Sequence, residues 1–248
     1  MTEQTSPSRK SFDPTTFRDK PVSFVRRGGR MTASQEYAWE HLRPHYVLDI
    51  EHGPAATSVA DGAHGDPAEI FGREAPLVVE IGSGQGHAIL HAAEQHPGTN
   101  FLAVEVFRAG LARTMLRAES AEIDNLRLAE VNAPELLEKY LPAGSIDELW
   151  VFFPDPWKKT RHIKRRLVND DFTRIVRGAL RPGGVLRLAT DWEDYAEQMR
   201  RVLDEAEGFE REFAGEWAER FDGRVLTAFE RKGAEKGREI RDLAYRRI

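Results

Sequence analysis

The sequence predicts an α/β fold with a mostly parallel sheet and helices on both faces. Two observations support this prediction. From residue 77 onward, short apolar runs alternate with segments in which apolar residues recur every three or four positions, which is typical of strands joined by helices. The chain has 248 residues, of which 40% are hydrophobic, so it is long and apolar enough to bury one substantial core.

Five strands are expected in the alternating part, at residues 77–81, 101–106, 126–131, 149–153 and 185–189. Helices are expected between them and after the fifth, with apolar faces at residues 88–93, 111–118, 136–140, 172–179 and 192–203. Two later strands, at 209–213 and 225–229, have no helical pattern between them. We therefore expect these two to pair as an antiparallel C-terminal hairpin that completes a seven-stranded sheet.

The N-terminal part is less regular. Residues 1–22 are polar and are predicted to form a flexible tail, which leaves residues 23–248 as one domain. Thr32 and Gln35 have the spacing of a capping box and predict a helix that runs towards Pro44. Residues 51–75 are rich in Gly, Ala, Pro and Asp, and they predict a long loop.

Composition excludes several classes of protein. The absence of cysteine excludes disulfides, thiolate nucleophiles and cysteine-ligated metals, and we expect no metal requirement. No apolar run approaches the ~20 residues of a membrane span, and the N-terminus lacks the apolar core of a signal peptide. The expected location is therefore the cytoplasm, without a membrane partner.

The charge is unevenly distributed. The net charge of −5 argues against nucleic acid when the chain is taken as a whole. Residues 158–166, however, carry six Lys or Arg and no acid, and such a local patch can bind a polyanion. Four of its cations are candidate RNA contacts: Arg161, Lys164, Arg165 and Arg166. A solvated surface without a partner is the alternative interpretation of this run.

The first predicted strand leads into a glycine motif, EIGSGQG, at residues 80–86. Glycines such as Gly82 let the backbone turn tightly and approach a ligand closely. Glu105, after the second strand, can accept hydrogen bonds from ribose hydroxyls. Together these features predict a nucleoside site, although the glycine motif alone would also fit a structural turn.

Polar side chains also follow the other strands. Asn132 follows the third strand, where it could bind a base or simply cap a helix ahead of Pro134. The fourth strand ends in FFPDPW, in which two prolines stiffen the backbone around Asp155. Asp191 follows the fifth strand and could bind a ligand, cap a helix, or do both.

Six motifs in this order resemble the bacterial tRNA (guanine-N7)-methyltransferase family: SFVRRGGRMT, EIGSGQG, FFPDPW, KKTRHIKRR, ATDW and TAFERKG. The resemblance covers roughly residues 23–248. It implies a Rossmann-like class I methyltransferase fold with S-adenosylmethionine as cofactor. It further implies transfer of a methyl group to N7 of a guanine in the variable loop of tRNA, and a monomer or homodimer.

The resemblance also assigns roles to single positions. It implies cofactor contacts, in addition to Gly82 of the glycine motif, at Glu80, Glu105, Asn132 and Asp155, with Asp155 also at the catalytic position. It implies substrate contacts at Lys159, Asp191, Thr227, Ala228, Phe229 and Glu230. Asn132 departs from the family, where Asp is frequent, so the contact to adenine can differ.

Other functions remain open at this point. A methyltransferase acting on another RNA, on a protein or on a small molecule is one alternative, and the protein or small-molecule acceptor would not require the basic run. A nicotinamide-dependent dehydrogenase would need a hydride-transfer site, and the sequence offers no convincing one. A noncatalytic RNA-binding module would not need the set formed by Glu80, Gly82, Glu105 and Asp155.

Overall fold

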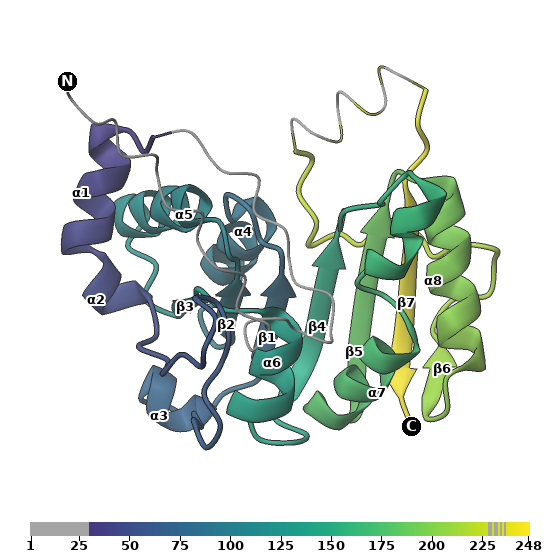
Figure 1. Ribbon diagram of the computed structural model, residues 1–248, viewed down its shortest axis with the longest axis horizontal. Coiled ribbons are helices and arrows are strands. Elements are labelled where there is room, and N and C mark those ends of the chain that lie inside the picture. The colour runs from purple at the N-terminus through teal and green to yellow at the C-terminus, as the bar shows by residue number, and fades with distance from the viewer. Residues whose placement is uncertain (1–29, 228–229, 231–232, 234, 236) are drawn as a thin grey trace, which may run out of the picture.

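The computed structural model describes residues 30–227, 230, 233, 235 and 237–248. Its centre is a seven-stranded sheet with the strand order β3-β2-β1-β4-β5-β7-β6 (Figure 1). The strands are β1 Leu77–Ile81, β2 Asn100–Val104, β3 Leu126–Ala129, β4 Ile146–Phe152, β5 Leu180–Thr190, β6 Phe209–Arg211 and β7 Arg241–Arg247. Strands β1 to β5 are parallel, whereas β7 pairs antiparallel with both β5 and β6.

Helices cover both faces of the sheet (Figure 1). The helical elements are α1 Ala33–His41, α2 Arg43–Tyr46, α3 Pro67–Phe71, α4 His87–Gln95, α5 Arg108–Ser120, α6 Ala133–Glu135, a π-helical turn Leu136–Tyr140, a 3₁₀-helix Thr160–Arg165, α7 Asp170–Ala179 and α8 Glu193–Glu205. The predicted mostly parallel α/β fold is thus confirmed.

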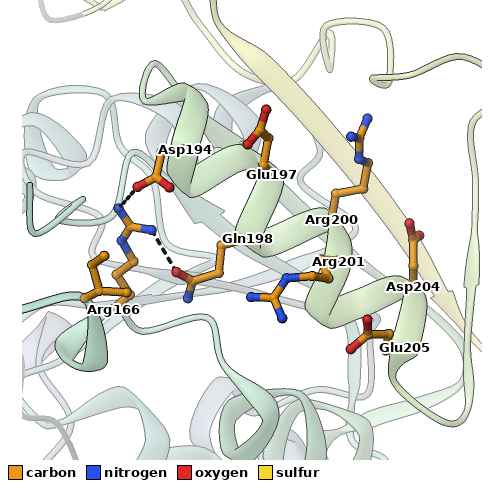
Figure 2. Close-up of a pocket in the computed structure, with 9 residues that line it drawn as sticks. Arg166, Asp194, Glu197, Gln198, Arg200, Arg201, Asp204 and Glu205 are labelled. Carbon is orange, nitrogen blue, oxygen red and sulfur yellow. Dashed lines mark hydrogen bonds and ion pairs between the residues drawn. The ribbon is translucent and has the colours of Figure 1, made fainter. Parts of the chain in front are cut away.

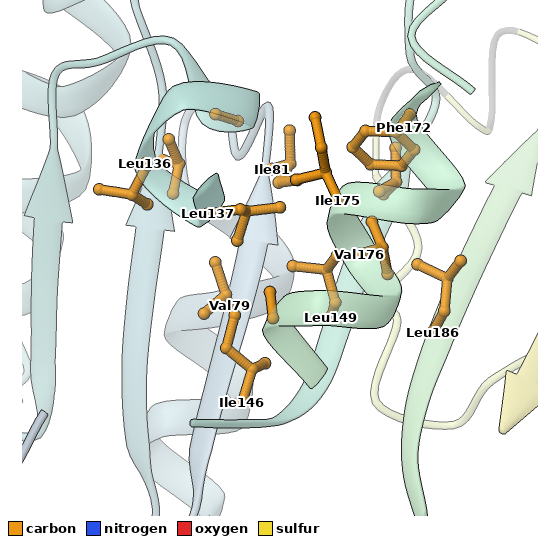
Figure 3. Packing of buried hydrophobic residues seen from close by; sticks show 14 of the residues in the cluster. Val79, Ile81, Leu136, Leu137, Ile146, Leu149, Phe172, Ile175, Val176 and Leu186 are labelled. Atoms are coloured by element: carbon orange, nitrogen blue, oxygen red, sulfur yellow. The ribbon is translucent and has the colours of Figure 1, made fainter. Parts of the chain in front are cut away.

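Alternation along the strands separates two cores. In β1, Val79 and Ile81 face one core, whereas Val78 faces the other. The first core holds the π-helical turn, α7 and α8 against the sheet, and Figure 3 shows the side chains of α7 packed over β1 and β4. The second core packs α1, α4 and α5 on the opposite face. Strands buried on both sides account for the nearly continuous apolar runs that predicted them.

The predicted capped helix in the N-terminal part is confirmed. Thr32 and Gln35 form the capping box, and α1 begins directly after Thr32. The segment predicted as a loop is mostly irregular but contains the short helix α3, which begins at Pro67 and is capped by Asp66. The predicted tail, residues 1–22, lies outside the described residues.

The prediction for the last strand is wrong. Residues 225–227 form no strand, and Leu226 is 56% exposed. The partner of β6 is instead β7, in which Leu243 and Tyr245 face the first core. Charged residues such as Arg241 and Arg246 flank these apolar residues, so the sequence shows no clear apolar strand here. In the folded chain Arg241 pairs with Glu193, and Arg246 pairs with Glu212 and donates to the carbonyl of Gly183.

The register of the parallel strands brings their carboxyl ends to one line. Ile81 pairs with Val104, which pairs with Ala129, and on the other side Ile81 pairs with Val151. Segments that follow β1 to β5 therefore emerge along one edge of the sheet. This is the edge at which open α/β sheets bind their ligands.

No helix among the described residues has the length and apolarity that crossing a membrane requires.

Candidate active site

Unpartnered polar atoms gather at the carboxyl edge of the sheet. Within the described part of the chain, five buried side-chain atoms lack a hydrogen-bond partner. Three of them lie near the carboxyl ends of β1 and β3: Glu80 Oε2 in β1, Ser83 Oγ in the loop after β1, and Asn132 Oδ1 after β3. Burying such atoms without partners is unfavourable, so their concentration at one edge indicates a place where a polar ligand binds.

Glu80 lies in β1 and is buried, with 5% of its surface exposed. Desolvation is the main cause that raises the pKa of this carboxyl to about 8; a hydrogen bond from the backbone N–H of Ile89 acts against it, and nearby Glu105 adds to the increase. Because Ile89 lies in the first turn of α4, Glu80 also satisfies one of the free N–H groups at the start of that helix. A cationic ligand group beside Oε2 would restore the charged form.

The glycine loop joins β1 to α4. Gly82 has φ +71° and Gly86 has φ +71°, a left-handed conformation that glycine adopts without strain. Gly84 N donates to Glu105 Oε2 at 2.9 Å, so the end of β2 holds the loop that follows β1. Glu105 Oε1 accepts from the backbone N–H groups of Val106 and Phe107 at 2.7 and 2.9 Å.

These bonds limit what Glu105 can still bind. A carboxylate offers about four acceptor positions, and three are occupied by backbone N–H groups. The remaining position on Oε2 suits one ribose hydroxyl rather than two. The predicted placement of Glu105 beside the glycine loop is thus found, with a smaller capacity than the sequence suggested.

The segment after β4 has unusual backbone geometry. Phe153 and Trp157 have φ of +52° and +44°, which is rare for residues with aromatic side chains and marks strain of the kind found at functional sites. Between them, Asp155 is exposed. The two flanking prolines and the two strained residues hold this carboxylate beyond the sheet edge.

Asp191 follows β5 and is largely buried. Its Oδ2 accepts from Arg238 Nη1 at 2.6 Å, and only 10% of the Asp191 side chain is exposed. The N-cap of α8 is Trp192, whose side chain makes no capping hydrogen bond. Lys159 is exposed and precedes the 3₁₀-helix Thr160–Arg165.

The segment around Thr227 is tied to a buried ion network. Thr227 N donates to Glu230 Oε2 at 3.0 Å, and Glu230 N donates to Thr227 Oγ1 at 3.2 Å. Glu230 has a fully buried side chain that pairs with Arg224 and with Arg220. Glu230 is therefore engaged by protein groups, in contrast to the predicted substrate contact. Ala228 and Phe229 lie outside the described residues.

The basic run divides into two parts. Arg161 and Lys164 are exposed, and the Arg165 guanidinium lies 5.2 Å from the centroid of the Trp157 ring. Arg166 differs, because it is 1% exposed and donates to Pro156 O, Gln198 Oε1 and Asp194 Oδ2 at 2.9, 2.7 and 2.5 Å. Figure 2 shows its bonds to α8.

The buried position of Arg166 does not fit the predicted RNA contact. Its guanidinium holds the carbonyl of Pro156 and the side chains of α8, so it braces the segment that contains Asp155. Its sequence neighbours remain candidates for RNA contact. The sequence did not distinguish the four cations, because burial is not visible in a run of like charges.

Several residues of this edge were not predicted. Ser83 stands between Gly82 and Gly84 of the glycine motif, and its small polar side chain was the available signal. Two further unpredicted residues are Glu135, which accepts a hydrogen bond from Asn132 Nδ2, and Arg238, which pairs with Asp191. Nothing in the sequence pairs residues 47 positions apart, so Arg238 could be found only in the folded chain.

The polar groups at this edge fit an S-adenosylmethionine-type group. Glu80 Oε2 is an unpartnered acceptor suited to an ammonium, Ser83 Oγ can bond a carboxylate, Glu105 has an acceptor position for a ribose hydroxyl, and Asn132 Oδ1 is an unpartnered acceptor. Among the residues that the structure describes, no three His, Asp or Glu side chains are placed to hold a metal ion.

Comparisons with known proteins agree with this geometry. A family profile described as "Putative methyltransferase" matches residues 74–243. A protein named tRNA (guanine-N(7)-)-methyltransferase from Arthrobacter sp. (strain FB24) is 41% identical, over 97% of this chain and 90% of the relative. A protein of the same name from Paenarthrobacter aurescens (strain TC1) is 42% identical, over 97% of this chain and 95% of the relative.

A solved structure supports the fold. The 16S rRNA methyltransferase KamB is similar with a TM-score of 0.55 and 16% identity, over 81% of this chain and 99% of that chain. At this identity the likeness concerns the fold alone.

Proposed function

Because this chain belongs to the tRNA (guanine-N(7)-)-methyltransferase family, we propose that it transfers a methyl group from S-adenosylmethionine to N7 of a guanine in tRNA, forming 7-methylguanosine. The observation that carries the proposal is the row of unpartnered buried atoms at the carboxyl edge of the sheet, together with the exposed carboxylate of Asp155 and the basic helix that follow β4 at the same edge. The acceptor guanine would lie in the variable loop of the tRNA, and a tRNA substrate implies a cytoplasmic location.

The cofactor would lie along the ends of β1, β2 and β3. Glu80 and Ser83 would hold its amino-acid part, Glu105 its ribose, and Asn132 its adenine. Gly82, with its left-handed backbone, lets the loop pass close to the ligand. The cofactor supplies an electrophilic methyl group on a sulfonium.

The acceptor atom needs little proton chemistry. Guanine N7 carries an in-plane lone pair and no proton, so its attack requires no general base. The purine becomes cationic as the bond forms, and the carboxylate of Asp155 would stabilise the developing charge. Asp155 could also accept from guanine N1–H and the exocyclic amine, a pattern that adenine does not offer. The strained and proline-flanked backbone keeps this carboxylate in place.

Substrate contacts would come from the neighbouring segments. Lys159, Asp191, Thr227, Ala228 and Phe229 remain candidates for contacts with the target nucleotide. Glu230 and Arg166 are assigned to holding the protein instead, since both are buried and paired. Arg161, Lys164 and Arg165 would contact the phosphate backbone of the tRNA.

The test is nucleoside analysis of tRNA after incubation with the protein and S-adenosylmethionine. We expect 7-methylguanosine in an unmodified transcript that carries guanine in its variable loop. The matched control is the same transcript with adenine at that position, which should stay unmodified. Methylation of the control, or methyl incorporation into protein and not into tRNA, would contradict the proposal.

A further inference from the structure

Asn132 presents two chemically different ends at the carboxyl end of β3. Its Nδ2 donates to Glu135 Oε1 at 3.2 Å. Its Oδ1 is buried and has no hydrogen-bond partner within the described residues, and the whole residue is 1% exposed. A side-chain amide turned by 180° would exchange donor and acceptor, so the ligand it can bind depends on what holds its orientation.

Glu135 determines that orientation. A carboxylate accepts hydrogen bonds and donates none, so the end of Asn132 that faces it must be the NH₂ group. The second carboxylate oxygen, Oε2, accepts from the backbone N–H of Val59 at 3.0 Å. Glu135 is thereby held from two sides and cannot turn away without losing a bond to a buried residue.

The register of the sheet indicates what lies next to Asn132. Val104 of β2 pairs with Ala129 of β3, so Glu105 and the segment leading to Asn132 emerge from adjacent strands. If the ribose lies at Glu105, the base attached to it extends towards β3. The acceptor left open on Asn132 is then the group that meets the edge of the base.

We propose that Glu135 is a positioning residue that holds the Asn132 amide with Oδ1 as its open acceptor, so that the site selects a purine with an exocyclic amino group over one with an oxo group there. This inference rests on the proposed function, because the purine is that of the cofactor. Where Asp stands at this position no such device is needed, since both of its oxygens accept.

The segment before α3 completes the arrangement. Asn132 N donates to Thr57 O at 2.6 Å, and Ser58 and Val59 are buried beside it. Solvent does not reach Oδ1, so a ligand donor reaches this atom only after neighbouring atoms shift. Residues 54–60, which contain no helix or strand, are bonded to Asn132 through Thr57 and to Glu135 through Val59. Glu135 therefore links the amide of Asn132 to this segment.

Calorimetric binding of two ligands tests this assignment without a turnover measurement. S-adenosylhomocysteine carries the 6-amino group, whereas S-inosylhomocysteine carries a 6-oxo group in its place. We expect the wild-type protein to bind the adenosyl ligand at least about tenfold more tightly, because the inosyl ligand loses a hydrogen bond and places two acceptors together. In Glu135→Ala the amide can turn, so the ratio should fall to about threefold or less.

Two further variants separate positioning from general support of the fold. In the double variant Asn132→Asp/Glu135→Ala both side-chain oxygens accept, so the ratio should return to about tenfold. Asp61→Ala removes the exposed ion pair with Lys139, directly after residues 54–60, and should leave the ratio unchanged. A merely structural Glu135 predicts that Glu135→Ala weakens both ligands equally, and an unchanged ratio would overturn the proposal.

The remaining outcomes are also decisive. If Glu135→Ala does not fold, Glu135→Gln takes its place. The single carbonyl oxygen of Gln cannot accept from both Asn132 Nδ2 and the backbone N–H of Val59, so the ratio of the two affinities should still fall. An unchanged ratio contradicts the proposal. Failure of the wild-type protein to bind either ligand would overturn the proposed function together with this inference. Tight adenosyl binding with no discrimination would overturn the inference alone.

Discussion

The guanidinium of Arg224 lies over the ring of Phe153, 5.3 Å from its centroid. Arg224 is itself buried, with a 2.7 Å bond from Nη2 to Asp242 Oδ2 and an ion pair with Glu230. Phe153 has a left-handed φ of +52° and precedes Pro154 and Asp155. This contact connects the ion network of Arg224, Glu230 and Asp242 to the strained segment after β4 that carries Asp155, the candidate catalytic carboxylate.

Replacing Arg224 should destabilise the protein strongly. Arg224→Met leaves the buried carboxylate of Asp242 without its counter-ion and leaves Glu230 with Arg220 alone, so we expect a loss of about 3–5 kcal/mol in the free energy of unfolding, measured in urea. Desolvation already raises the pKa of Asp242, and the loss of Arg224 raises that pKa further, so the deficit should shrink as pH falls and the carboxylates protonate. Arg220→Met is the matched control, since Arg220 also pairs with Glu230 but is 41% exposed, and it should cost less than about 1 kcal/mol. A similar loss in both variants would contradict this ranking.

Glu80 should make stability depend on pH. Burial raises the pKa of Glu80 to about 8, above its unfolded value, so the native state keeps this proton over a wider range than the unfolded state does. The native state is therefore favoured at low pH and loses stability as pH rises through about 8. Glu80→Gln removes the titration, so its unfolding free energy relative to wild type should increase between pH 5 and pH 8.5 when measured without ligand. A constant difference across this range would show that Glu80 does not titrate there.

The basic helix should control the salt dependence of tRNA binding. If Arg161, Lys164 and Arg165 each contact a phosphate, changing all three to Gln should reduce the slope of log K against log salt by about two to three units. Arg166→Gln is the internal comparison, because this buried residue should lower stability and leave the slope nearly unchanged. An unaltered slope in the triple variant would move the RNA surface elsewhere, for example to the basic residues around Arg30.

Asp155→Asn should separate catalysis from binding. The substitution keeps the shape of the side chain and removes the charge that would stabilise a cationic purine, so we expect the methyl-transfer rate to fall about 10²-fold or more. Binding of tRNA should be largely retained, because the charge matters most in the transition state. Single-turnover kinetics with saturating tRNA measures the step directly. An unchanged rate would make Asp155 a structural residue held by its prolines.

Much of this protein was accessible from its sequence. Strands β1 to β3 were predicted within two residues of their ends, because strands buried on both faces form short apolar runs, whereas β4 and β5 begin three and five residues before the predicted starts at 149 and 185. The glycine motif and the polar residues after each strand placed the candidate site at one edge, since parallel strands end together. The capping box of α1 was likewise a local signal, carried by two residues three positions apart.

Only the tertiary structure decided which polar residues face a ligand and which hold the protein. Arg166 and Glu230 look like their neighbours in sequence, yet both are buried and paired with residues more distant in the chain. The last strand was missed for a related reason, because the charges of its arginines are matched by groups such as Glu193 and Glu212 on other elements. Local patterns report periodicity and turn chemistry, whereas burial and charge pairing depend on contacts between segments that only folding brings together.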